Sequence, residues 1–413
     1  MGKITTVSPL APKALPVLLP VAGVRLAKAE AGIRYKGRPD VMLALLDPGS
    51  VVVGTFTRSK SPSAPVDWCR ENLKKGQARA IIVNAGNANA FTGKAGVATV
   101  KAVAQGVAKA IGAKPQEIFQ ASTGVIGEPM DPAPLLKVVP ELIAQADASG
   151  FSDAAQAIMT TDTFAKAVSV QAKLGGKKVT ITGIAKGSGM IAPDMATMLV
   201  FLFTDAKLPR AILQKLLARA TDQSFNCITV DGDTSTSDTV LFAATGQGAG
   251  LTDVRSADDA RLRDFSRALH EATRELAILV AKDGEGAEKL ITIDISGAEN
   301  DVAARRIGLA IANSPLVKTA IAGEDANWGR IVMAVGKSGE KAIRDKLKIR
   351  IGGVIVAQKG MREASYVEAD IMPHMKGRDI AIGVDLGIGK GKARVWTCDL
   401  THRYIDINGS YRS

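Results

Sequence analysis

The chain has 413 residues, of which 46% are hydrophobic and 23% charged, and its formal net charge is +12. This length exceeds what one ordinary hydrophobic core organises, so we expect two domains or two interlocked lobes. The composition is that of a globular protein and excludes a disordered or fibrous one. The basic residues are scattered and aromatic residues make up only 4%. Nucleic-acid-binding proteins concentrate basic residues on one face and stack bases on aromatic rings, so we expect no nucleic-acid partner.

The sequence predicts a cytoplasmic protein without a membrane partner. No uninterrupted apolar run reaches the roughly 18 residues of a membrane-spanning helix, and the N-terminus lacks the charged-then-apolar layout of a signal peptide. The three cysteines, Cys69, Cys227 and Cys398, are odd in number and widely spaced. This pattern is typical of buried thiols in a reducing compartment.

Helical and strand periodicities alternate along the chain without a fixed repeat. In chain order the predicted elements are a strand at residues 79–84, a helix at 100–111, a strand at 179–182, a helix at 262–279, and strands at 291–295, 347–351 and 354–356. Gly352 and Gly353 are expected to form a hairpin turn between the last two strands. Helices and strands do not follow a strict βαβ rotation, so we predict an α+β fold rather than a doubly wound parallel sheet.

The most abrupt change of character lies between Lys186 and Phe203. A loop rich in glycine, with one proline, runs directly into an uninterrupted apolar segment whose first residue is Thr197. An apolar strand without alternation is typical of a strand that is buried on both faces.

Several kinds of chemistry are not supported by the sequence. His270, His374 and His402 lie apart from one another and from other ligands at metal-binding spacing, so we expect no zinc or other metal site. We place His270 on the surface of the second predicted helix. There is no Gly-x-Ser-x-Gly elbow, no Walker loop and no dinucleotide fingerprint. Residues 387–391, Gly-Ile-Gly-Lys-Gly, follow a strand but open no helix, and we interpret them as a hairpin turn. Chemistry without a cofactor is therefore expected.

A stretch rich in Asp, Ser and Thr lies at residues 231–239. Its carboxylates have a spacing that could hold a cation, but the closing Glu of a calcium loop is missing. Because Ser and Thr readily bond neighbouring backbone groups, we interpret it as a hydrogen-bonded loop that lines a site.

Several blocks of sequence, in one order, resemble the ornithine acetyltransferase family, the bifunctional glutamate N-acetyltransferases and amino-acid acetyltransferases of arginine biosynthesis. The resemblance spans almost the whole chain. The blocks are residues 84–89 (NAGNAN), 122–127 (STGVIG), 159–163 (MTTDT), 186–198 (KGSGMIAPDMATM), 282–287 (KDGEGA), 314–319 (SPLVKT) with 325–330 (DANWGR), and 411–413 (YRS). One departure lies at residues 56–66, where the family more often has Asn near Ser59 and Ala in place of Ser63.

The resemblance implies a self-cleaving αββα-like core of the N-terminal-nucleophile kind, shared with aminopeptidases, and a second, smaller α/β lobe. In that family the precursor is cut before the threonine of the Met-Ala-Thr-Met-Leu block, which here is the bond between Ala196 and Thr197. The implied products are fragments 1–196 and 197–413, which stay together as a heterotetramer with two copies of each.

A cut at this bond would supply a base that the sequence otherwise lacks. A threonine hydroxyl is a weak nucleophile and needs an adjacent base, and no histidine is near Thr197 in the sequence. A free α-amine has a pKa of about 7.7 to 8, so roughly a tenth to a fifth of it is neutral at pH 7. Gly187 and Gly189 would allow the bend that presses the hydroxyl against the Ala196 carbonyl for an N-to-O acyl shift.

The resemblance also implies the rest of the site. Thr123 and Gly124 would stabilise an oxyanion through a hydroxyl and a backbone N–H. Lys186 suits a substrate carboxylate and Glu285 suits an ammonium, such as that of ornithine. The C-terminal residues 405–413, which include an alternating strand pattern, would fold into the site. The substrate-binding residues implied by the family are Thr163, Lys186, Thr197, Glu285, Asn408 and Ser413.

These inferences predict a ping-pong transferase that uses no metal or organic cofactor. Thr197 would take the acetyl group from N-acetylornithine, release ornithine and pass the acetyl group to glutamate. Whether acetyl-CoA also serves as a co-substrate stays open at this point. The alternatives are an N-terminal-nucleophile aminopeptidase or amidase that passes the acyl group to water, an uncut binding protein for acidic metabolites, and a nucleic-acid-binding protein.

Overall fold

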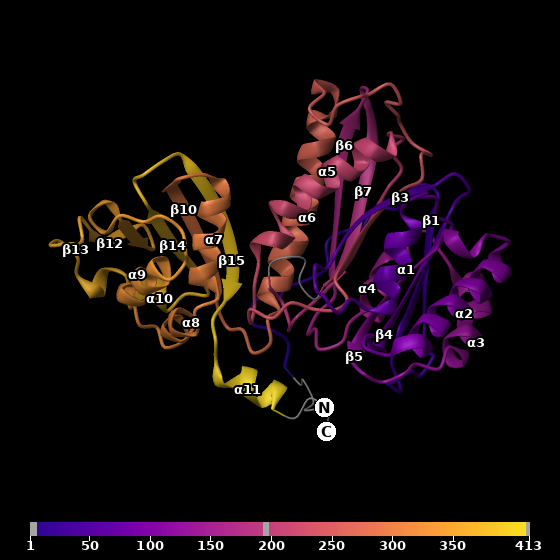
Figure 1. Cartoon of the computed structure of the whole chain (residues 1–413), viewed down its shortest axis with the longest axis horizontal. Coiled ribbons are helices and arrows are strands. Elements are labelled where there is room, and N and C mark those ends of the chain that lie inside the picture. The colour runs from indigo at the N-terminus through magenta and orange to yellow at the C-terminus, as the bar shows by residue number, and fades with distance from the viewer. Residues whose placement is uncertain (1–5, 193–197, 410–413) are drawn as a thin grey trace.

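The computed structural model describes residues 6–192 and 198–409, which form a larger and a smaller lobe (Figure 1). The strands of the larger lobe are β1 (Val24–Ala29), β2 (Val41–Leu46), β3 (Val51–Phe56), β4 (Ala80–Asn87), β5 (Ile118–Val125), β6 (Lys166–Leu174), β7 (Lys177–Lys186), β8 (Leu199–Thr204) and β9 (Thr239–Ala244). Its helices are α1 (Ala64–Asn72), α2 (Gly93–Ile111), α3 (Ala133–Gln145), α4 (Phe151–Ala157), α5 (Arg210–Asp222) and α6 (Arg263–Lys282).

The larger lobe is a four-layered αββα structure. One sheet has the strand order β1-β2-β4-β5 and the other has the order β3-β9-β8-β7-β6. A hydrophobic cluster that includes Met42, Phe119, Phe201 and Phe203 fills the space between the two sheets. On the outer faces, α2 and α3 cover the first sheet and α5 and α6 cover the second. This arrangement confirms the predicted α+β class and the αββα core.

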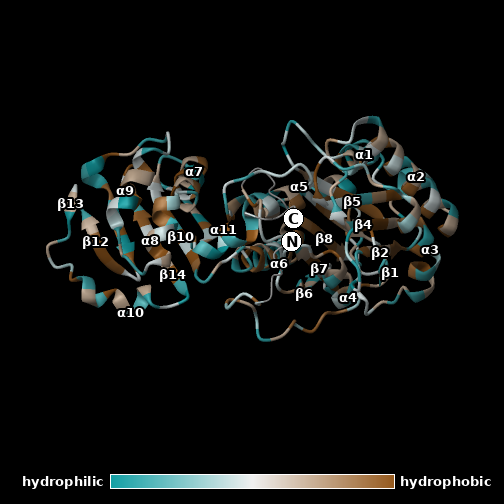
Figure 2. Ribbon diagram, turned by 90° about the horizontal axis from the view of Figure 1, so that it is seen from below, coloured by the Kyte–Doolittle hydropathy of each residue, from teal (hydrophilic) through white to brown (hydrophobic). Residues whose placement is uncertain are grey.

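Strand β8 is buried along its whole length because both of its faces meet apolar layers. Leu199, Phe201 and Phe203 join the cluster between the sheets, whereas Val200 and Leu202 pack toward α5 and α6. Figure 2 shows β8 and β2 in the hydrophobic colour along most of their length. The prediction of a strand buried on both faces is confirmed, with its first residue at Leu199.

The smaller lobe contains a mixed sheet with the order β13-β12-β11-β14-β10-β15. Helices α7 and α9 pack together, and α7 lies against β10 and β15. Its strands are β10 (Leu290–Ala298), β11 (Lys348–Ile351), β12 (Val354–Gln358), β13 (Met361–Arg362), β14 (Asp379–Asp385) and β15 (Gly391–Cys398), and its helices are α7 (Asp301–Ala312), α8 (Pro315–Ala322), α9 (Trp328–Gly336) and α10 (Met372–Met375). The predicted second, smaller α/β lobe is therefore confirmed.

Most of the predicted elements are confirmed, with shifts of a few residues at their ends. The two apolar stripes lie on α2 and α6, and the predicted turn at Gly352 and Gly353 joins the antiparallel pair β11 and β12. All three cysteines are free and buried. His270 is half-buried on α6, where burial lowers the pKa of its imidazole. No helix in the described ranges is long and apolar enough to cross a membrane.

Two local predictions are wrong. Residues 387–391 do not form a hairpin turn, because β14 and β15 are not neighbours: β10 lies between them, parallel to β14 and antiparallel to β15. The C-terminal segment does not begin as a strand, since residues 402–408 form helix α11 (His402–Asn408). The alternation that indicated a strand covers only Ile405 to Asn408, and so short a pattern does not distinguish a strand from one turn of helix.

Candidate active site

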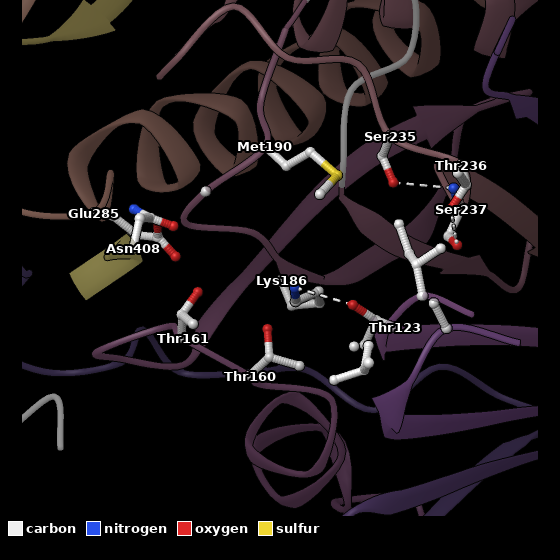
Figure 3. A pocket seen from close by; sticks show the side chains of 15 residues that line it. Thr123, Thr160, Thr161, Lys186, Met190, Ser235, Thr236, Ser237, Glu285 and Asn408 are labelled. Carbon is white, nitrogen blue, oxygen red and sulfur yellow. Dashed lines mark hydrogen bonds between the residues drawn. The ribbon is translucent and has the colours of Figure 1, made fainter. Parts of the chain in front are cut away.

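A cavity of about 260 Å³ opens where the two sheets of the larger lobe end (Figure 3). Its walls come from the end of β5, the loop between α4 and β6, the end of β7, the loop before β9, the loop after α6 and the end of α11. Five of the predicted catalytic and substrate-binding residues lie along this cavity, namely Thr123, Gly124, Lys186, Glu285 and Asn408.

The other predicted site residues lie elsewhere. Thr163 is absent from the lining of this cavity and borders a neighbouring space of about 20 Å³, which also touches Glu285. Its hydroxyl bonds the Asp283 carboxylate, and its oxygen accepts the Ser8 N–H at 2.9 Å. The cleavage position, Ala196 and Thr197, and the C-terminal Ser413 lie outside the described residues.

Thr123 and Gly124 lie near the end of strand β5, where it runs parallel to β4. Gly124 has a φ of +133°, and a Cβ at this position would lie 2.2 Å from the Gly86 carbonyl carbon. Only glycine fits this close approach of two backbones. The Thr123 side chain is buried, with 4% of the residue exposed. Thus the predicted oxyanion residues are fixed by strand pairing.

Lys186 is the last residue of β7, and only 3% of it is exposed. Its Nζ lies 3.2 Å from the Thr123 Oγ1, the contact drawn as a dashed line in Figure 3, and 3.9 Å from the Asp162 Oδ2. Burial lowers the pKa of Lys186, because the charged form is poorly solvated there, although the Asp162 carboxylate acts in the opposite direction.

A buried ionic cluster of Asp162, Lys166 and Asp283 lies beneath the cavity. The Lys166 Nζ donates to the Asp162 Oδ1 at 2.7 Å and to the Asp283 Oδ2 at 2.6 Å, and all three side chains are fully buried. Burial alone would raise the pKa of Asp162, but the charges of Lys166 and Lys186 hold it below its usual value. Sequence reasoning missed this cluster. The blocks at 159–163 and 282–287 contain both aspartates, but Lys166 gives no signal in the sequence.

The first two residues of the loop after Lys186 are held by hydrogen bonds. The Gly187 N–H donates to the Asp162 Oδ1 at 2.7 Å, and the Ser188 Oγ donates to the Asp283 carbonyl oxygen at 2.6 Å. A Cβ on Gly189 would lie 2.4 Å from the Glu285 carboxyl carbon. The glycine at this position is therefore needed because the Glu285 side chain occupies the space beside it.

The next two residues of this loop are held by Asp231. Its carboxylate accepts the N–H groups of Met190 at 2.6 Å and Ile191 at 2.9 Å. The Tyr404 hydroxyl lies 3.3 Å from the same carboxylate, which ties α11 to the loop. The segment at 231–239 thus contributes a structural carboxylate.

Glu285 and Asn408 join the larger lobe to α11. The Asn408 Nδ2 donates to the Glu285 Oε2 at 2.7 Å. Glu285 is 7% exposed, and burial raises the pKa of its carboxyl group, although the bond from Asn408 favours the charged form. A carboxyl oxygen of Glu285 is therefore held at one end of the cavity, while the Lys186 side chain lies nearer the middle (Figure 3).

The segment before β9 forms the wall opposite Glu285. Ser235, Thr236 and Ser237 line the cavity, as the sequence predicted for the loop at 231–239. The next residue, Asp238, is fully buried, and its Oδ1 accepts the Met198 N–H at 3.2 Å. Burial raises the pKa of Asp238 well above its ordinary value. No pattern in the sequence indicated that this aspartate contacts the residue after Thr197.

Residues 56–66, where the sequence departs from the family pattern, lie against the same wall. The Ser63 N–H donates to the Thr236 carbonyl oxygen at 2.8 Å, and the Thr57 hydroxyl donates to the Ser235 carbonyl oxygen at 2.6 Å. Residues 56–66 thus support the wall through one backbone and one side-chain hydrogen bond. Among the described residues, no group of three or more His, Cys, Asp or Glu side chains is placed to hold a metal ion.

Comparison with known proteins defines the class of the protein. A curated relative from Bradyrhizobium diazoefficiens is 57% identical over 411 residues, covering 99% of this chain and 100% of the relative. One from Agrobacterium fabrum is 55% identical over 409 residues, covering 98% of this chain and 99% of its own length. Both are named arginine biosynthesis bifunctional protein ArgJ. The chain is an acetyltransferase of arginine biosynthesis.

A match to a family model identifies the family to which the chain belongs. The model of the ArgJ family matches residues 25–413, and the chain belongs to this family. Among solved structures, the chain is similar to an arginine biosynthesis bifunctional protein from Bacillus halodurans, with 39% identity and a TM-score of 0.48 over 51% of this chain and 98% of that one. It is also similar to an ornithine acetyltransferase from Mycobacterium tuberculosis complexed with ornithine, with 35% identity and a TM-score of 0.37 over 42% of this chain and 92% of that one.

Proposed function

We propose that the chain cuts itself between Ala196 and Thr197 and that the new N-terminal Thr197 carries the acetyl group from N-acetylornithine to glutamate. One observation carries this proposal. The cavity gathers an oxyanion-type pair, Thr123 and Gly124, a buried ammonium and a buried carboxylate, and the residues on both sides of the cleavage segment are anchored at its walls. Met190 lines the cavity, and Met198 is bonded to Asp238, next to the lining residue Ser237.

The topology supports two fragments that stay together after the cut. The cleavage position lies between β7 and β8, which are hydrogen-bonded neighbours in the five-stranded sheet. Strands β8 and β9 would belong to fragment 197–413, and they lie between β7 on one side and β3 on the other, both from fragment 1–196. Hydrogen bonds on both sides would therefore hold the fragments together without the peptide bond. We propose that two such pairs form a heterotetramer.

The chemistry needs only groups of this chain. The Thr197 Oγ attacks the acetyl carbonyl carbon of N-acetylornithine, and its proton passes to the α-amine of the same residue. The Thr123 hydroxyl and the Gly124 N–H stabilise the tetrahedral oxyanion. When the C–N bond breaks, the ornithine nitrogen takes the proton and leaves. The α-amine of glutamate then attacks the acetyl ester by the same steps in reverse.

Charge complementarity supports the substrate assignment. N-acetylornithine carries a side-chain ammonium and a carboxylate. Glu285 offers a buried anionic oxygen for the ammonium, with Asn408 holding its other side. Lys186 offers positive charge on the same cavity. Thr163 would act on substrate only indirectly, through its bond to Asp283, because it does not line this cavity.

The proposed reaction uses no metal or organic cofactor, because Thr197 supplies the nucleophile and the base, and Thr123 and Gly124 supply the oxyanion donors. The relatives' name, bifunctional protein, supports acetyl-CoA as a second donor to the same Thr197. We propose that the enzyme acts in the cytoplasm.

Intact-mass measurement and activity assays test the proposal together. The wild-type chain should give two fragments in place of the 43.1 kDa precursor, and Thr197→Ala should stay in one piece. Purified wild type should acetylate glutamate with N-acetylornithine and, in a separate assay, with acetyl-CoA. Two fragments from Thr197→Ala would overturn the cleavage site. Steady hydrolysis of N-acetylornithine without dependence on glutamate would identify an amidase instead.

A further inference from the structure

Cleavage of the precursor needs a base that acetyl transfer does not need. A threonine hydroxyl attacks a carbonyl carbon only when a neighbouring group takes its proton. In acetyl transfer that group is the α-amine of Thr197. In the uncut chain the same nitrogen belongs to the peptide bond with Ala196, and a backbone amide N–H is a donor with no basic lone pair. Another group must therefore take the proton in the precursor.

Asp238 lies beside the position where this base is needed. Its Oδ1 accepts the Met198 N–H at 3.2 Å. The Met198 nitrogen is three covalent bonds from the Thr197 nitrogen, which standard bond lengths limit to a separation of about 4 Å. Ser237, the residue before Asp238, lines the active-site cavity. The Asp238 carboxyl group is therefore within reach of the bond to be cut.

The second carboxyl oxygen of Asp238 is available for this chemistry. The residue is fully buried, and its Oδ2 forms no hydrogen bond with any of the described residues. The main chain around it is fixed, because the Thr57 N–H donates to the Asp238 carbonyl oxygen at 3.0 Å and the Thr239 N–H donates to the Met198 carbonyl oxygen at 3.1 Å. Buried polar atoms are nearly always bonded, so a carboxyl oxygen left without a partner here calls for a functional explanation.

We propose that Asp238 transfers the proton during self-cleavage, taking it from the Thr197 hydroxyl and returning it to the Thr197 nitrogen. The inference rests on the proposed function, because it assumes the cut between Ala196 and Thr197. It goes beyond that function by assigning the base of the uncut chain.

The step balances with groups of this chain and one water molecule. The Thr197 Oγ bonds to the Ala196 carbonyl carbon while its proton passes to the Asp238 Oδ2. The C–N bond then breaks, and the Thr197 nitrogen takes the proton from Asp238. The products are an ester and a free α-amine, and Asp238 is ionised as at the start. Water then hydrolyses the ester, which leaves a carboxyl group on Ala196 and returns the Thr197 hydroxyl.

The surroundings of Asp238 suit a group that both accepts and donates a proton. Burial raises the pKa of Asp238 well above its ordinary value. The Met198 N–H, the Thr57 side chain and the Lys186 charge act in the opposite direction and favour the carboxylate. A carboxyl group with a raised pKa exchanges protons more readily near neutral pH. Because only the carboxylate accepts the hydroxyl proton, self-cleavage should slow as pH falls through the raised pKa.

The rate of self-cleavage measures this role directly. The full-length precursor is made by cell-free synthesis, and its conversion to two fragments is followed by intact mass at a series of pH values. The wild-type rate should fall on acidification with an apparent pKa above the ordinary aspartate value of about 3.9. Asp238→Asn should cleave about 10²- to 10⁴-fold more slowly, the usual contribution of general acid–base catalysis, and should lack this acid limb.

Asp238→Glu separates proton transfer from simple support of Met198. Asparagine keeps an oxygen that can accept the Met198 N–H but cannot take a proton, whereas glutamate keeps the acid and alters the geometry. Proton transfer therefore predicts faster cleavage with glutamate than with asparagine, and a supporting role predicts the reverse order. Circular dichroism checks that each variant folds. If Asp238→Glu does not fold, the pH profiles of wild type and Asp238→Asn decide.

Asp399→Asn is the matched control. Asp399 is 3% exposed, and its Oδ2 also forms no hydrogen bond with the described residues. Its Oδ1 accepts the N–H groups of Glu288 at 2.8 Å and Lys289 at 3.0 Å, which belong to the chain between α6 and β10 and not to the cleavage segment. This variant should cleave at the wild-type rate.

Three results would overturn the assignment of Asp238. They are wild-type cleavage by folded Asp238→Asn, an acid limb in that variant equal to that of wild type, and slower cleavage by folded Asp238→Glu than by Asp238→Asn. An uncut wild type, or two fragments from Thr197→Ala, would show instead that the proposed function has failed, so the two failures are distinguishable.

Discussion

Replacing Gly189 by alanine perturbs substrate recognition through a single methyl group. The added Cβ would lie 2.4 Å from both the Cδ and the Oε2 of Glu285, which is far inside van der Waals contact. Glu285 is 7% exposed and held by the Asn408 Nδ2 at 2.7 Å. The carboxylate must therefore move out of its place, and the bond to Asn408 breaks or lengthens.

The expected loss follows from the role of Glu285 in the proposed function. A hydrogen bond to a charged group contributes about 1.5 to 3 kcal/mol, which corresponds to roughly a 10- to 150-fold change in binding. The KM for N-acetylornithine, which carries an ammonium, should rise by that factor. The KM for glutamate, whose side chain carries no ammonium, should change much less.

Steady-state kinetics on the cleaved variant measure this contrast. Gly336→Ala is the matched control, because a Cβ at this position would point into open space and the φ of Gly336 is not positive. It should leave both KM values unchanged. Equal increases in the two KM values, or no change in either while the circular dichroism spectrum stays that of wild type, would refute the assignment of Glu285 to the ammonium.

Three further predictions concern charge and the C-terminal helix. Because burial raises the pKa of Asp238, the free energy of unfolding of wild type should fall as pH rises from the ordinary carboxyl range through the raised pKa, by at most about 1.4 kcal/mol per pH unit. Urea unfolding at a series of pH values should show that the free energy of unfolding of Asp238→Asn lacks this fall with pH. The same fall in the variant and in wild type would contradict the prediction. Lys166→Met leaves two fully buried carboxylates without their shared cation and should cost about 3 to 5 kcal/mol in urea unfolding; a loss below about 1 kcal/mol would show that the cluster is not ionised. Ending the chain after Thr401 removes α11 and the bond from Asn408 to Glu285, so acetyl transfer should be lost while circular dichroism stays native, and retained transfer would exclude α11 from the site.

Local pattern determined much of the secondary structure. The spacing of side chains along one segment determines which of its residues can face a core. The apolar stripes on α2 and α6 and the uninterrupted apolar run of β8 were therefore readable from the sequence. The same applies to the turn at Gly352 and Gly353. The sequence blocks around Thr123, Lys186 and Glu285 also marked residues that the fold places along one cavity.

The partners of these residues were decided only by the tertiary structure. Lys166 bonds Asp283 across 117 positions of sequence, and no local pattern can report such a contact, because it depends on which strands become neighbours. The failed hairpin at 387–391 has the same cause, since β10, from far earlier in the chain, inserts between β14 and β15. The conformation of a short terminal segment such as α11 likewise depends on the residues that it contacts, here Asp231 and Glu285. The sequence by itself therefore determined the kinds of elements and several residues of the site, and long-range packing decided how their charges are paired.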